Sequence, residues 1–438
     1  MVPPRQLNRC HYRGMVVVAG LFLHTTVLRA EVPTDQYKHL GVATCASSVC
    51  HGKLSPQSDR NVWLNEYRVW TRARRHSETY RLLENEQSRT IARNLGLTSA
   101  TTAKVCLDCH ADNVPADRRG PKFQITDGVS CEACHGGAEN WIESHAEAEA
   151  THEDNLARGM YPTESPQARA ALCLSCHLGT DEKFATHDIM GAGHPRLSFE
   201  LEAFTANQPA HYEVDDDYRR RKGEIPGFNL WVTGQLQNAM SYLELIRSDL
   251  FPGNGQFPEL AFYDCHACHH AMDEKRWTPE RGGPGVPPGS PRLQDQHLLL
   301  LEVVAEVVES DAAAGEIRSA AETFVAAGHS DLARARSVAA TLIEVLTRHQ
   351  ATWATAKYNL DTVRGVRRAL IRAAAQGRMS DFNAAEQTYL ALESLSYSIG
   401  DRQALEDTLD SLYLEVETNS AFDPGSFAAA ARRGQERF

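Results

Sequence analysis

The sequence has few features of a membrane protein and none of a disordered or fibrous one. After Leu28 it contains no apolar run long enough to span a bilayer. Its 42% hydrophobic and 23% charged residues are ordinary globular values, so the composition excludes disorder and fibre-forming repeats. A length of 438 residues allows two or three domains, each with its own core.

The sequence also lacks cysteines that disulfides could use. Of its 11 cysteines, ten belong to five short motifs in which a histidine follows the second cysteine, and the eleventh is Cys10. A disulfide framework would not demand that histidine. A second alternative is a zinc site built from two Cys-x-x-Cys pairs, since the pairs at 106/109 and 131/134 lie almost at the spacing found in zinc ribbons. The histidine that follows each pair argues against zinc as well.

Four of the motifs have the Cys-x-x-Cys-His pattern that attaches haem c covalently. Two thiols on one helical turn add to the porphyrin vinyl groups, and the next residue's imidazole binds the iron as proximal ligand. The fifth motif has four residues between Cys45 and Cys50, and a looped insert would still bring both thiols to one ring. The sequence therefore predicts five haems c, attached at Cys45, Cys50, Cys106, Cys109, Cys131, Cys134, Cys173, Cys176, Cys265 and Cys268, with proximal ligands His51, His110, His135, His177 and His269.

Five irons need up to five distal ligands, and twelve further histidines lie beyond residue 30. His76 follows an aromatic helix face, and His145 and His152 lie two turns apart on one predicted helix. His187 and His194 flank glycines, which allow the backbone to approach a flat ring closely. We predict five distal ligands, His76, His145, His152, His187 and His194, with His211 as a weaker reserve candidate and Met190 as an alternative ligand.

From about Gly41 to Trp231, the order of these features resembles the multihaem cytochrome family that includes the tetrahaem electron acceptor of hydroxylamine oxidoreductase. The matching stretches are Thr44–Gly52, Trp70–His76, Gly128–Gly136 and Gly191–Pro195. The resemblance implies a mostly helical, loop-rich fold in which haems stack in close pairs and electrons hop between them. It also implies bis-histidine irons for most haems, with distal ligands at His76, His145, His187 and His194. The wide first motif, the haem near Cys265 and a long C-terminal extension depart from the family's pattern.

Composition divides the chain into four parts. Residues 1–30 are expected to be a signal peptide, since arginines precede the apolar run from Met15 to Leu28; an uncleaved anchor is the alternative. Residues 35–277 form the multihaem domain, and 278–292 form a Pro/Gly-rich linker. In residues 293–438, apolar residues recur at three- and four-residue spacing. The predicted fold class is therefore mainly α: a loop-rich multihaem cytochrome domain followed by a helical bundle or helical-repeat domain.

These features predict an exported, periplasmic or otherwise extracytoplasmic pentahaem cytochrome that relays electrons between redox partners. The sequence favours a carrier over a catalyst; the alternative is an oxidoreductase acting on a small nitrogen or sulfur compound at a haem with an open coordination site. Loss of residues 1–30 removes four arginines and changes the formal charge from −12 to −16, which disfavours nucleic acid and favours partners with basic docking surfaces. A membrane-associated electron donor and an oligomer formed through the C-terminal helices are further expectations.

Overall fold

The computed structural model describes residues 36–438 except 58–61, 209, 254–256 and 271–284. The described chain is mainly helical and contains no β-strand, only the isolated bridges His39/Arg119 and Tyr263/Leu293, so the predicted fold class is confirmed. Within the described residues, no helix combines the length and apolar character needed to cross a membrane.

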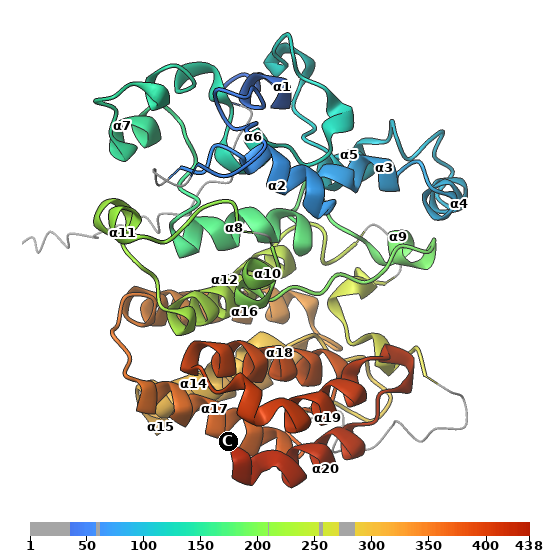
Figure 1. Ribbon diagram of the computed structural model, residues 1–438. Helices are drawn as coiled ribbons and strands as arrows, with labels where there is room; N and C mark the ends of the chain where they lie inside the picture. The colour runs from blue at the N-terminus through green and yellow to red at the C-terminus, as the bar shows by residue number, and fades with distance from the viewer. Residues whose placement is uncertain (1–35, 58–61, 209, 254–256, 271–284) are drawn as a thin grey trace, which may run out of the picture.

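The N-terminal half consists of short helices joined by long loops (Figure 1). Its α-helices are α1 (Val42–Cys45), α2 (Glu66–Ala73), α3 (Thr79–Leu82), α4 (Glu86–Asn94), α5 (Lys104–His110), α6 (Cys131–His135), α7 (His152–Ala157), α8 (Pro166–His177), α9 (His187–Gly191), α10 (Leu201–Asn207) and α11 (Asp216–Lys222). Only two small apolar clusters lie here, one around Leu83 and Leu107 and one around Leu174 and Phe199. Side chains alone therefore build little core in this half.

The C-terminal half is a layered array of longer helices. These are α12 (Gly227–Arg247), α14 (Gln296–Val308), α15 (Asp311–Ala327), α16 (Leu332–Trp353), α17 (Leu360–Ala375), α18 (Phe382–Ile399), α19 (Glu406–Val416) and α20 (Pro424–Gly434). Most begin at a short polar side chain that accepts a first-turn N–H, as at Ser310, Asp331, Asn359, Asp381 and Asp423.

One continuous hydrophobic core extends from Phe228 in α12 to Phe438 at the C-terminus. Helix α12 packs against both α16 and α8, and so it connects the two halves. Gly234 allows α12 to pack closely on α10 as well, because a Cβ there would lie 2.6 Å from the Cβ of Leu201 in α10. The core thus extends across the expected linker, and the fifth Cys-His motif lies against the C-terminal helices.

Candidate multihaem site

Each of the four narrow motifs forms a helical turn. Three of them end α5, α6 and α8, and the fourth begins in the 3₁₀ turn Cys265–Ala267. None of the ten cysteines among the described residues forms a disulfide. Each turn therefore presents two thiols and an imidazole within five residues.

The wide first motif closes on itself as a loop. Helix α1 ends at Cys45, the insert turns over an N–H···O bond from Cys50 to Ser47, and His51 N–H then donates to the carbonyl of Cys45 at 3.0 Å. Gly52 allows this return, because a Cβ there would lie 1.9 Å from the Ala46 oxygen. The four inserted residues thus bulge outward and leave the two ends of the motif adjacent.

Every proximal histidine faces one other histidine. The ring centroids are 6.2 Å apart in the pairs His51–His145, His110–His194, His135–His211 and His187–His269, and 6.4 Å apart in His76–His177. Metal–imidazole bonds are about 2.0 Å long and a ring nitrogen lies roughly 1.2 Å from its ring centre, so an ion held between two imidazoles separates their centroids by about 6.4 Å. The five pairs therefore fit five irons, each with two protein ligands.

Hydrogen bonds at Nδ1 orient several of these rings. His51 Nδ1 lies 2.9 Å from Oε2 of Glu66, and His110 Nδ1 lies 3.2 Å from the carbonyl of Thr79. His194 Nδ1 lies 2.7 Å from the carbonyl of Pro195. A carbonyl or carboxylate at Nδ1 fixes the proton there and leaves Nε2 as the coordinating nitrogen.

Burial favours the neutral form of five of the ten paired imidazoles, and the neutral form is the one that binds a metal. It lowers the pKa of His135 to about 4, and it lowers the pKa values of His76, His177, His110 and His145. His51 differs, because its hydrogen bond to Glu66 raises its pKa.

The predicted distal residues divide into four that face a proximal histidine and one that is placed elsewhere. His76, His145, His187 and His194 lie in the pairs, whereas His152 Nε2 lies 2.8 Å from Oε1 of Glu164. The reserve candidate His211 instead faces His135. The sequence ranked His152 above His211 because His152 was expected two turns after His145 on one helix. That helix is not formed, since His145 lies in the 3₁₀ turn Ser144–Ala146 and His152 begins the separate helix α7.

Most other histidines have different partners, and Met190 lines a cavity. His39 lies against Asp112, His266 against the Asn419 carbonyl, His297 against Gln235 and His349 against Glu309.

Thiols of different motifs lie close together. The Cys45 thiol interacts with that of Cys131, and the Cys109 thiol with that of Cys176. Lys183 spans the second contact, since its Nζ lies 3.2 Å from Cys176 Sγ and 3.3 Å from the Asp108 carbonyl. The first motif is therefore beside the third, and the second is beside the fourth.

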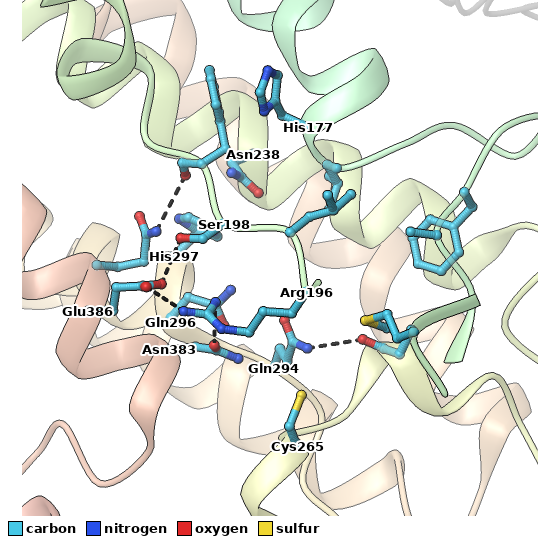
Figure 2. Close-up of a pocket in the computed structure, with 18 residues that line it drawn as sticks. His177, Arg196, Ser198, Asn238, Cys265, Gln294, Gln296, His297, Asn383 and Glu386 are labelled. Atoms are coloured by element: carbon cyan, nitrogen blue, oxygen red, sulfur yellow. Dashed lines mark hydrogen bonds and ion pairs between the residues drawn. The ribbon is translucent and has the colours of Figure 1, made fainter. Parts of the chain in front are cut away.

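A polar cavity of about 90 Å³ separates the fourth motif from the fifth (Figure 2). His177 lies at one end of the labelled set and Cys265 at the other, with Arg196 between them. Arg196 pairs with Glu386 of α18, and Ser198 Oγ donates to the same carboxylate at 2.7 Å. These two contacts to Glu386 hold the loop after α9 against the C-terminal helices.

The fifth motif is fixed to the helical core. Asp264 accepts the N–H of His266, and the N–H of Asp264 donates to the carbonyl of Arg292 at 2.8 Å. The His266 ring packs 5.6 Å from Phe382 and 6.2 Å from Phe422. The fifth motif is thus part of the C-terminal array.

Comparison with known proteins also points to a c-type cytochrome. Residues 44–136 match the family model described as cytochrome c554 and c-prime, a stretch that includes the first three motifs. Neither the curated proteins nor the solved structures contain a match to this chain. The family match supports a c-type cytochrome with covalently bound haem and a role in electron transfer.

Proposed function

We propose that this protein is an extracytoplasmic pentahaem c-type cytochrome that relays electrons between redox partners. The five imidazole pairs carry the proposal, because each pair has the separation that one iron between two histidines requires. Haem c supplies reversible one-electron chemistry at its iron. Two histidines at each site would saturate an iron held there and would leave no free position for a substrate.

The chain's own residues attach, orient and cover the cofactor. Ten cysteines supply the thioether sulfurs, and the Nδ1 partners such as Glu66 and Pro195 direct each Nε2 toward the opposite ring. Phe199 covers His177, with ring centroids 4.9 Å apart, and excludes water from that side. The fourth ligand pair is thereby kept in an apolar setting, which controls the reduction potential.

The thiol contacts support an order for the relay. Cys45 next to Cys131 joins the first attachment site to the third, and Cys109 next to Cys176 joins the second to the fourth. The cavity lined by His177 and Cys265 places the fifth beside the fourth. In this arrangement the C-terminal helices carry the terminal site of the relay.

The location and partners of this relay are also part of the proposal. The predicted signal segment, residues 1–30, lies outside the described residues. We expect an exported protein whose acidic surface docks a basic redox partner, with a membrane-associated donor as one candidate and self-association through the C-terminal helices as another.

Redox titration with electron paramagnetic resonance tests the proposal. The oxidised protein should show only low-spin ferric signals, and full reduction should take up five electrons per chain. Mass spectrometry of the mature chain should show five covalent haems. Fewer haems, or electron uptake well below five, would contradict a pentahaem relay.

A further inference from the structure

The wide first motif presents apolar side chains to solvent. Its insert bulges outward, where Val49 is 81% exposed, and Leu54 just after the motif is 76% exposed. These are the two most exposed large hydrophobic residues in the described part of the chain. The attachment cysteine between them, Cys50, is exposed as well. Single exposed apolar residues are ordinary, whereas two that flank one attachment cysteine favour a contact surface at the cofactor.

Basic side chains of helix α2 lie next to this loop. The Tyr67 N–H donates to the His51 carbonyl at 3.0 Å, which fixes the start of the helix to the motif. Arg68 Nε donates to the carbonyl of Gly52 at 3.4 Å. Arg72 follows Arg68 by one turn on the same face of α2, and its side chain is exposed. Apolar residues with a basic border therefore lie at the first attachment site.

The charge of this region is opposite to that of the whole chain. The described residues 45–57 and 62–75 carry five cations and a single carboxylate, whereas the chain has a net charge of −12. The carboxylate, Glu66, lies 2.9 Å from His51 Nδ1. No carboxylate among the described residues forms an ion pair with any of the five, although Arg81 pairs with Glu78 elsewhere. The five cations are Lys53, Arg68, Arg72, Arg74 and Arg75.

The carboxylates near the first iron site lie on the side of His145 instead. Glu143 and Glu147 flank the turn Ser144–Ala146 that carries this histidine, and both are exposed. His51 and His145 face each other with ring centroids 6.2 Å apart, so the motif loop and the turn lie on opposite sides of an iron held between them. The apolar and basic groups therefore share the proximal side.

The first attachment site is also one end of the proposed relay. Its thiol contact is with the third motif, whereas the fifth motif lies at the other end, beside the C-terminal helices. A relay exchanges electrons with its partners at its terminal sites. Transient redox complexes have small interfaces, and opposite charges bring the two proteins together in the correct orientation.

We propose that the first-motif face, formed by Val49, Lys53, Leu54, Arg68 and Arg72, docks a small redox protein whose cofactor edge is surrounded by carboxylates. This inference rests on the proposed electron relay. Val49 and Leu54 form the centre that excludes water, and the cations form the rim that steers the approach. One electron crosses the contact at a time, so reduction of the first ferric iron oxidises the partner's one-electron cofactor, and the reverse step restores both. Anionic lipid is disfavoured as the occupant, because the rest of the chain is acidic.

Stopped-flow oxidation of the reduced holoprotein tests this face with two electron acceptors of opposite charge, the acidic copper protein plastocyanin and the basic mitochondrial cytochrome c. Arg68→Glu combined with Arg72→Glu should lower the second-order rate constant for plastocyanin at least about tenfold at low salt, and the difference should shrink at about 0.5 M salt. The rate constant for cytochrome c should not fall. The matched control is Arg364→Glu with Arg368→Glu, which has the same spacing and charge change on α17 and should leave the plastocyanin rate close to that of the wild type.

Val49→Ser tests the apolar centre without changing the charge. It should lower the plastocyanin rate at least about threefold, and this loss should persist at high salt because it does not depend on charge. Should the double arginine variant lose haem, Arg72→Glu alone repeats the test, since this side chain makes no hydrogen bond within the described chain.

An unchanged plastocyanin rate in the arginine variants, or an equal loss in the α17 control, would overturn the inference. So would binding to phosphatidylglycerol vesicles that the arginine variants lose while plastocyanin oxidation stays the same, because lipid would then be the occupant. Haem content and electron uptake are measured first on every sample. A wild type that takes up fewer than five electrons contradicts the relay, whereas full uptake with no effect of the substitutions contradicts the docking face alone.

Discussion

The thiol of Cys45 interacts with the thiol of Cys131, although 86 residues separate them in the sequence. The contact brings the irregular first motif to the edge of the third. Two porphyrins attached at these sulfurs would meet at their thioether edges, so the first and third sites should communicate most directly.

Replacing both cysteines of the wide motif should remove one haem and leave the others attached. We expect the double variant Cys45→Ser, Cys50→Ser to carry four haems by mass spectrometry, because both sulfurs of one site are absent. Cys10→Ser is the control and should retain five. A five-haem double variant would show that the wide motif is not an attachment site.

Loss of the carboxylate behind the first proximal histidine should change one reduction potential. Oε2 of Glu66 lies 2.9 Å from Nδ1 of His51, and such a partner makes the imidazole a better donor to the oxidised metal. Glu66→Gln should therefore raise the midpoint potential of one haem by tens of millivolts in a spectroelectrochemical titration. Glu153→Gln, an exposed change, should not. A titration curve identical to that of the wild type would argue against the assigned ligand.

Glu132, inside the third motif, should be important for stability. Its buried carboxylate accepts the N–H groups of Leu40, Gly41 and Ala138 at 2.7–2.8 Å. Glu132→Ala leaves three donors without this partner, two of them buried, which should cost about 3 kcal/mol. Thermal unfolding followed by circular dichroism should show a clear drop in Tm, whereas exposed Glu139→Ala should stay close to the wild type. Equal losses in the two variants would contradict this role.

Glu200 should make stability depend on pH. Its carboxylate is buried, accepts the N–H of Ala203 and the hydroxyl of Ser394, and burial raises its pKa from 4.5 to about 7. The unfolded chain therefore loses this proton first, so the stabilising contribution is complete below pH 4.5 and is lost as pH rises through 7. Between pH 5 and 8 the wild type should lose about 2–3 kcal/mol relative to Glu200→Gln, measured by denaturant unfolding. Parallel pH profiles would rule this out.

The two halves should differ in their need for haem. The C-terminal core is built from protein side chains, whereas the N-terminal half has only small apolar clusters. Without haem attachment, limited proteolysis should digest residues 36–200 and leave a resistant fragment containing α12 to α20. Equal resistance of both halves in the haem-free chain would contradict this division.

Sequence and structure contributed differently to the distal ligands. His76 and His194 were recognisable from an aromatic helix face and a glycine-rich loop, because those patterns are local. His211 was not, since it lies 76 residues beyond His135 and its role depends on where a surface segment returns. His152 is much nearer in sequence, yet it faces Glu164.

The amino-acid sequence by itself predicted the sites of haem attachment and determined the helical character of the C-terminal region. Thioether spacing is covalent chemistry within one turn, and helical periodicity is a property of neighbouring residues. Only the tertiary structure decided which histidine faces which, which thiols adjoin, and that the fifth motif belongs with the C-terminal helices. Those relationships depend on how distant segments pack, because they are set by burial and by hydrogen bonds between residues far apart in the sequence.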